Sequence, residues 1–226
     1  IWYCARPSMS SYYNKVPATT VRRHPERAAY DRDTIDAILD EGLIGHVGLI
    51  CDGQPFVMPM LYARRGEHLY LHGSPKSRLL SAVAEGARIC FTVTLLDGLV
   101  LARSAFHHSL NYRSVVVLGQ GRAVRKGEEK QAALRTLVDH VMTGRSEQVR
   151  GPSEPELKVT EVVVLDLREA SAKVRTGPPV ENPNDYTLPV WAGELPLELA
   201  VGVPAPDSRC QVPEPPTLKA YRRGRT

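Results

Sequence analysis

The chain has 226 residues, and its 29 Lys and Arg against 25 Asp and Glu give a formal net charge of +4. A hydrophobic fraction of 42% and a charged fraction of 24% are those of an ordinary globular protein. No run of about 18 apolar residues occurs, so no membrane partner is expected. The small charge excess is spread along the chain, and we expect no nucleic-acid partner.

The positions of the cysteines and prolines indicate the class of protein more clearly than the net charge does. The cysteines at 4, 51, 90 and 210 are widely separated and form no C-x-x-C pair, which predicts neither a disulfide framework nor a zinc site. We therefore expect a cytoplasmic protein. His107 and His108 are adjacent, a poor arrangement for chelating one metal ion, and no metal is expected. Of the 18 prolines, 12 follow residue 150.

This uneven proline content predicts three regions. Residues 1–30 show little periodicity and are expected to be a poorly ordered lead-in, with Met9 as the natural start because the chain begins with isoleucine. Residues 31–197 are predicted to form the folded domain. Residues 198–226 are predicted to be a proline-rich, basic and disordered tail.

The first half of the domain begins with a helix and continues with strands. Ile35, Ile38 and Leu39 recur at helical spacing within 31–41, and Gly42 supplies the stop. The dipeptide Asp52-Gly53 predicts a tight hairpin turn. Strands are predicted over 43–51, 55–64 and 68–73.

The second half adds two helices and further strands. Ser74 is predicted as the N-cap of a helix with Pro75 at its first position, and Gly86 ends that helix. Asp97-Gly98 predicts a turn. The remaining strands are predicted over 88–96, 99–105, 112–124, 159–167 and 173–175, with a helix over 127–142. Together these elements predict an α+β protein built on a mostly antiparallel six-stranded barrel with two or three helices.

Two prolines mark one strand as unusual. Pro55 and Pro59 remove two backbone donors from the strand at 55–64, so this strand is expected to lie at a sheet edge or to present its carbonyl groups to another partner. Free backbone groups on such an edge suit a planar heterocycle that forms several hydrogen bonds.

The segment after the third strand predicts an anion site. Ser74 and Ser77 offer hydroxyl groups, and Lys76 and Arg78 add positive charges at a predicted helix N-terminus. These groups are suited to binding a phosphate. The alternative is a capped amphipathic helix whose basic side chains are solvated.

Four stretches of the sequence resemble a known family. The chain is similar to the FMN-binding split barrels related to pyridoxamine 5′-phosphate oxidase, and in particular to the nitroimidazole-resistance branch. The resemblance runs from about Val21 to Leu197. It rests on Phe56–Tyr62, Leu69–Arg78, Tyr112–Arg122, and Ala172–Pro179 with Leu188–Gly193.

The resemblance implies a homodimer with FMN in each of two clefts at the interface. The C-terminal motif of the true vitamin B6 oxidases is not found, so oxidation of pyridoxamine phosphate is not expected. The positions that match the cofactor-binding residues of the family are Val57, Met58, Pro59, Met60, Tyr62, Ser74, Lys76, Arg78, Tyr112, Arg113, Ser114, Lys173, Arg175 and Trp191.

The resemblance also places His72 at the position of an active-site histidine. A histidine there is a candidate proton donor, and the alternative is a cap or a surface hydrogen-bonding residue. We predict an FMN-dependent oxidoreductase that passes electrons from a reduced nicotinamide to a small electron-poor substrate such as a nitroaromatic. The alternatives are a non-catalytic flavin carrier, or the same fold with a deazaflavin or haem. Haem would take His72 or His107 as an axial ligand.

Overall fold

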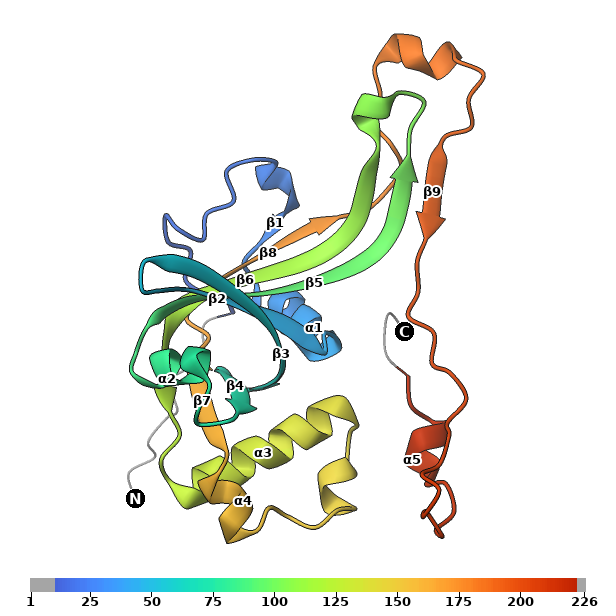
Figure 1. The fold of residues 1–226 in the computed structure, drawn as a ribbon. Coiled ribbons are helices and arrows are strands. Elements are labelled where there is room, and N and C mark those ends of the chain that lie inside the picture. Colours follow the sequence, from blue (N-terminus) through green and yellow to red (C-terminus); the bar gives the residue numbers. More distant parts are fainter. Residues whose placement is uncertain (1–10, 223–226) are drawn as a thin grey trace, which may run out of the picture.

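The computed structural model describes residues 11–222, so the predicted start at Met9 lies outside the described residues. Its helices and strands follow one another along the chain as Figure 1 shows. The strands are β1 (Ala28–Ala29), β2 (Ile44–Cys51), β3 (Gln54–Arg65), β4 (His68–Gly73), β5 (Arg88–Leu101), β6 (Ser109–Ala123), β7 (Glu161–Asp166), β8 (Glu169–Arg175) and β9 (Gly193–Pro196). The helices are α1 (Arg32–Glu41), α2 (Arg78–Ala84), α3 (Gly127–Val141), α4 (Glu154–Lys158) and α5 (Pro216–Lys219).

Six of the strands close into a barrel. The sheet order is β1-β8-β6-β7-β4-β3-β2-β5-β9, and a further pairing of β5 with β6 joins the ring of β6, β7, β4, β3, β2 and β5. Every pairing is antiparallel. The predicted α+β class and the six-stranded antiparallel barrel are therefore confirmed, and β1, β8 and β9 extend the sheet beyond the ring.

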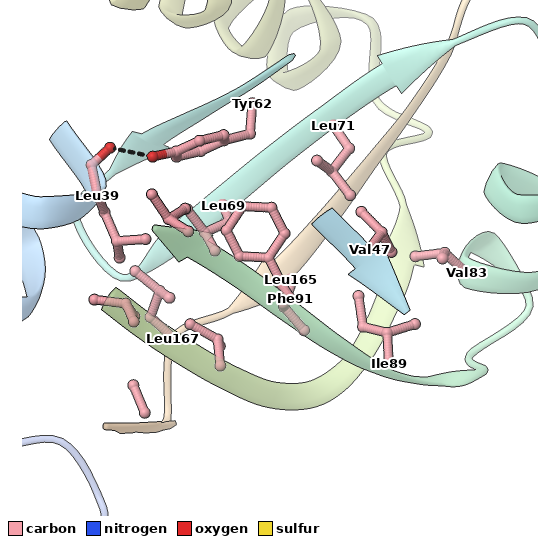
Figure 2. Close-up of a cluster of buried hydrophobic side chains, with 14 of the residues drawn as sticks. Leu39, Val47, Tyr62, Leu69, Leu71, Val83, Ile89, Phe91, Leu165 and Leu167 are labelled. Carbon is pink, nitrogen blue, oxygen red and sulfur yellow. Dashed lines mark hydrogen bonds between the residues drawn. The ribbon is translucent and has the colours of Figure 1, made fainter. Parts of the chain in front are cut away.

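The barrel interior is filled by aliphatic side chains around two aromatic rings (Figure 2). Tyr62 and Phe91 are completely buried and meet edge to face, with ring centroids 5.0 Å apart. The Tyr62 hydroxyl donates a 2.6 Å hydrogen bond to the carbonyl oxygen of Leu39, so its one polar group is satisfied inside the core. The predicted apolar face of α1 is confirmed, since Ile35, Ile38 and Leu39 are all buried.

A smaller apolar cluster lies outside the ring. Tyr70 of β4 and Val162 and Val164 of β7 pack against Ala133 and Leu134 of α3. Figure 1 shows α3 lying across these two strands. Side chains alternate along a strand, so the odd residues of β4 face the barrel interior and the even ones face α3.

The predicted turn at Asp97-Gly98 is wrong. Strand β5 continues through these residues with a register shift between Leu96 and Gly98, which is a β-bulge. The local turn preference is overridden because β5 pairs here with β6 on one side and with β9 on the other. The Leu197 amide, just after β9, donates to the Asp97 carbonyl oxygen at 3.1 Å. A Cβ at Gly98 would lie 3.0 Å from the Leu195 carbonyl oxygen, so glycine allows β9 to approach.

The predicted start of the second helix is also wrong. Helix α2 begins at Arg78, and its N-cap is Ser77, whose hydroxyl accepts from the Leu80 amide at 3.3 Å. Ser74 instead begins a turn, because its carbonyl oxygen accepts from the Ser77 amide at 2.9 Å. Its hydroxyl accepts from the Lys76 amide at 3.2 Å. The cap moves by one turn because both serines suit an N-cap and only the second one directly precedes the apolar stripe.

The N-terminal segment lies against the barrel, whereas the segment after residue 199 is mostly exposed. Tyr13 is buried and its hydroxyl donates to the Asp36 carboxylate at 2.6 Å, while β1 pairs with β8. After β9 the chain runs beside the barrel to α5, as Figure 1 shows. Within residues 11–222, no helix is long and apolar enough to cross a membrane.

Candidate functional site

One half of β3 has an open edge. The strand pairs with β2 from Gln54 to Leu61, but it pairs with β4 only from Tyr62 to Arg65. On the side away from β2, no described strand pairs with residues 54–61. The prolines therefore lie on the half of β3 that has one open side, although β3 as a whole is an interior strand between β4 and β2 and not the predicted edge strand.

The side chains of this half are divided between solvent and core. Val57 and Met58 are 64% and 49% exposed, and Pro59 is exposed as well. Met60 packs against the core. The Tyr62 side chain is enclosed in the barrel and its backbone pairs with Leu71 of β4, so Tyr62 lies outside the open edge.

The basic residues predicted to bind phosphate lie next to the open edge. The Arg78 guanidinium carbon is 4.4 Å from the centre of the Phe56 ring on β3. A cavity of about 240 Å³ is lined by Phe56 and Met58 on one side and by Ser77, Arg78 and Leu79 on the other. The structure thus brings together two predicted residues, Met58 on β3 and Arg78 at the start of α2, which are separated in the sequence by β4.

These basic side chains have no acidic partner. Ser74, Lys76 and Arg78 are exposed, and in the described part of the chain neither Lys76 nor Arg78 forms an ion pair. Since most other arginines on the barrel are paired with carboxylates, the unpaired Arg78 at the cavity, with Lys76 two residues before it, is suited to an anionic group.

His72 is half-buried near the end of β4. Its register partner is Val162, and by alternation its side chain shares the outer face of the sheet with Tyr70. The Nδ1 atom is buried, and no described residue forms a hydrogen bond with it. Burial lowers the pKa of His72 below its ordinary value. The imidazole is therefore neutral at neutral pH.

The lowered pKa of His72 predicts a pH dependence of stability. The unfolded chain takes up a proton near the ordinary value of 6.5, whereas the folded chain takes it up only at lower pH. The free energy of unfolding should therefore fall as pH drops below 6.5 and through the lowered folded pKa. Urea unfolding at about pH 7.5 and about pH 5 should show a smaller loss for His72→Gln than for the unchanged protein. The exposed His46→Gln is the matched control, and equal losses in all three proteins would contradict the prediction.

A second group of predicted residues lies on β6 and β8, where the side chains already have protein partners. Arg113 binds two carboxylates: its Nη2 lies 2.8 Å from Glu41 Oε1 and 2.8 Å from Asp97 Oδ1. Hydrogen bonds to Glu41 and Asp97 raise the pKa of Arg113. Arg113 therefore ties the end of α1 to the β5–β6 pair.

Arg175 has a comparable role in the fold. It is buried and donates to the Asn111 side chain, to the Gly177 carbonyl oxygen at 3.0 Å and to the Pro178 carbonyl oxygen at 3.2 Å. Burial lowers its pKa. The guanidinium thus fixes the chain where it leaves β8.

The other residues of this group are spread over the same surface and beyond it. Lys173 Nζ donates to the Arg23 carbonyl oxygen at 3.0 Å, and the Ser114 hydroxyl donates to the Lys173 carbonyl oxygen at 3.3 Å. Tyr112 is half-buried on β6. Trp191 lies outside the barrel and is 68% exposed. The single chain does not bring these residues to the open edge of β3.

No pattern along the chain predicted two features of the structure. One is a cavity of about 520 Å³ between the end of α1, β5 and the segment after β9, lined among others by Glu41, Asp97, Arg113 and Leu197. The other is a polar cluster at the tip of the β5–β6 hairpin, held by the buried carboxylate of Glu181. Both depend on segments that follow the barrel.

Residues 31–174 match the family model described as pyridoxamine 5′-phosphate oxidase. The chain belongs to this family. Its barrel is accordingly the flavin-binding split barrel of the pyridoxamine 5′-phosphate oxidase family, and the predicted resemblance is confirmed.

Two solved structures of this type are similar over nearly the whole chain. The flavocytochrome Anf3 from Azotobacter vinelandii is 41% identical, with a TM-score of 0.87, and the match covers 92% of this chain and 98% of that one. A FAD and heme binding protein from Mycobacterium smegmatis is 33% identical, with a TM-score of 0.80, covering 86% and 96%. The search of curated proteins gave no match.

A third structure shares the fold alone. A protein from Bacteroides thetaiotaomicron, named for 5-nitroimidazole antibiotic resistance, is 23% identical with a TM-score of 0.56 and covers 65% of this chain and 86% of that one. By contrast, 92% of 226 residues is about 208 residues, so the flavocytochrome match extends past residue 197. The pyridoxamine 5′-phosphate oxidase family member described here therefore shares part of its C-terminal segment with the flavocytochrome.

Proposed function

We propose that the protein is a flavin-dependent oxidoreductase. The observation that supports this most is the unpaired cation Arg78 against Phe56 of the half-open β3, with the unpaired Lys76 two residues before it, in a chain of this family. The exposed backbone of residues 57–60 is suited to hydrogen bonds with a flavin ring. The two cations are suited to its phosphate.

The residues present fit a flavin nucleotide. A bound flavin would supply the redox chemistry, while the chain binds and orients it. FMN is the form that the sequence predicts, and FAD is the second candidate because a relative is named for binding it. His72 remains the candidate for a residue that holds or moves a proton, since its unpartnered Nδ1 has no structural use in the described residues.

The proposed reaction takes electrons from a reduced nicotinamide and passes them to a small electron-poor molecule. The proposed acceptor is a nitroaromatic, which is the class implied by the resemblance to the nitroimidazole-resistance branch. The split edge of β3 supports this proposal, because an open strand edge leaves one face of a bound ring accessible to a second molecule.

We also propose haem as a second cofactor. The two relatives above 30% identity are named as a flavocytochrome and as a FAD and heme binding protein, and each match covers most of both chains. Haem iron takes an imidazole as an axial ligand in many proteins. The described chain offers such imidazoles in His72, His107 and His108.

A homodimer is the proposed assembly. Ile44, Ile50 and Val57 expose large apolar side chains on the β2–β3 face. Leu195, Leu197 and Leu199 do the same along the C-terminal segment. Apolar surface of this extent favours a protein partner, and a second copy could supply Tyr112 or Trp191 to the open edge. Light scattering should give twice the mass of the chain, and a monomer with bound flavin would contradict this assembly.

The test of the proposed function is anaerobic reduction. The protein is loaded with FMN or FAD, desalted, and mixed with NADH or NADPH. We expect the flavin absorbance to bleach and to return when a nitroaromatic is added. Bound flavin that neither nicotinamide reduces would instead indicate a carrier, and failure to retain either flavin would contradict the proposal.

A further inference from the structure

The segment after β9 forms an extended arm, which we define as residues 197–214. The arm begins beside β5, where the Leu197 amide donates to the Asp97 carbonyl oxygen. It leads to α5, where the Thr217 hydroxyl accepts from the Gln148 side chain at 3.3 Å. Figure 1 shows the arm running past the barrel between these two places. The arm is therefore held at both ends by its own chain.

The middle of the arm is not held in this way. Every residue from 198 to 214 is exposed, and no hydrogen bond links residues 198–206 to another described residue. The match to the flavocytochrome covers about 208 residues and so includes part of the arm, which means that its course is not peculiar to this chain.

Apolar side chains occupy alternate positions along the first part of the arm and the strand before it. The odd positions are large and apolar, and between 37% and 96% exposed: Leu195, Leu197, Leu199, Val201 and Val203. The even positions between them hold a proline, a glutamate, an alanine and a glycine. A period of two is that of an extended chain with one apolar face. The pattern therefore predicts that the odd positions pack against an apolar surface.

The barrel of the same chain covers only the start of the arm. Leu197 and Leu199 line the cavity of about 520 Å³ together with Leu43 and Leu95. They nevertheless remain 37% and 68% exposed, and the lining of the cavity ends at Leu199. The described part of the chain therefore does not supply the surface that the odd positions need.

A surface of the required kind lies on the outside of the barrel. Val47 of β2 and Phe91 of β5 point into the core, so their even-numbered neighbours point outward. On β3, Val57 is opposite Gly48 of β2 and points the same way. We call the outward-pointing residues of β2, β3 and β5 before the β-bulge the outer face.

The outer face is apolar and open in the single chain. Its large apolar side chains are between 46% and 66% exposed: Ile44, Ile50, Val57 and Leu96. The described strands place no acidic side chain on it. A sheet face in contact with water normally carries polar side chains, so this face favours a protein partner.

The outer face continues toward the arm across three paired strands. Leu195 of β9 is opposite Leu99 of β5, which is opposite Leu110 of β6. Leu110 precedes by two residues Tyr112, the register partner of Leu96, so this row lies on the side of the outer face. One chain thus carries two adjoining apolar surfaces, a strand-like arm and a sheet face, and each has the chemistry that the other lacks a partner for.

We propose that the odd positions of the arm of one copy pack on the outer face of a second copy. A two-fold dimer covers both surfaces at once, since each chain offers one arm and one outer face. The inference rests on the proposed homodimer and names the contact that holds it together. Because Val57 belongs to the open half of β3, the arm of one copy then lies next to the proposed flavin edge of the other.

The test places charges on the two sides of the arm in the full chain. Leu199→Asp with Val201→Asp should raise the Kd of the dimer at least about hundredfold in sedimentation equilibrium, because two apolar contacts become buried carboxylates. Ala200→Asp with Gly202→Asp is the matched control, with the same charge on the other side, and should change the Kd less than about threefold. No atom lies within 4 Å of the Cβ position of Gly202, so a side chain fits there.

A mixing experiment shows whether the contact is between copies. Ile44→Asp with Ile50→Asp alters the outer face and should weaken the dimer as the Leu199→Asp, Val201→Asp variant does. A mixture of these two variants should form more dimer than either alone, because the intact arm of one chain meets the intact outer face of the other. Recovery on mixing also shows that both variants are folded.

The outcomes separate this inference from the proposed assembly. An unchanged protein that is a dimer, with a Leu199→Asp, Val201→Asp variant that dimerises like the control, would overturn the arm contact and leave the homodimer intact. A mixture that recovers no dimer would overturn it in the same way. An unchanged protein that is a monomer would overturn both.

Discussion

Replacing Lys76 and Arg78 together by alanine weakens flavin binding by roughly 30- to 700-fold. The double change removes two charge-assisted hydrogen bonds to the flavin phosphate, and their loss costs about 2–4 kcal/mol after partial compensation by water and neighbouring donors. The effect should be large because neither cation has an acidic partner in the described residues that would already weaken its attraction for an anion. The measurement is a titration that follows quenching of flavin fluorescence.

A matched control removes the same charge elsewhere. Arg135 and Lys158 are exposed and form no ion pair within residues 11–222, and both lie on helices far along the chain from the β3 edge. Replacing both by alanine should change flavin affinity only slightly, because exposed charges at a distance are screened by salt. If the control and the test variant lose affinity equally, the effect is one of net charge and the phosphate assignment is wrong.

Replacing Phe91 by alanine lowers the free energy of unfolding by about 3–5 kcal/mol. Phe91 is completely buried in the barrel and packs edge to face on Tyr62. The ring lies so close to β2 that a Cβ at Gly45 would be 2.1 Å from it, and Gly45 has no side chain that could fill the cavity. Urea unfolding measures the loss.

The control for this prediction is a truncation at the surface. Val159 is 67% exposed at the end of α4, and Val159→Ala should change stability by less than about 0.5 kcal/mol. A loss below about 1 kcal/mol in Phe91→Ala would mean that the barrel interior relaxes around the missing ring. The described packing would then be wrong.

Local sequence patterns predicted much of the barrel. The spacing of Ile35, Ile38 and Leu39 identified α1 and its buried face, and Pro55 with Pro59 predicted an edge that residues 54–61 of β3 have on one side only. Both signals act over a few residues and need no distant partner. The turn predicted at Asp97-Gly98 was wrong because a local turn preference is weak compared with pairing to β6 on one side and β9 on the other.

The candidate site was predictable only where its parts lie on adjacent segments. Arg78 and Met58 come together because β3, β4 and α2 follow one another. Arg113 and Arg175 matched the family as cofactor residues, but Glu41, 72 residues away in the sequence, binds the Arg113 guanidinium, and Asn111, 64 residues away, binds that of Arg175. Glu181 lies 78 residues from Arg103, so no pattern along the chain could reveal that pair.

The central claim is that the open edge of β3 with Lys76 and Arg78 binds a flavin. The most direct measurement is the absorption spectrum of the protein after incubation with excess FMN or FAD and removal of free ligand on a desalting column. The proposal predicts that the two flavin bands elute with the protein, shifted from those of free flavin, at about one flavin per chain. A colourless protein fraction with all the flavin in the low-mass fraction would contradict it.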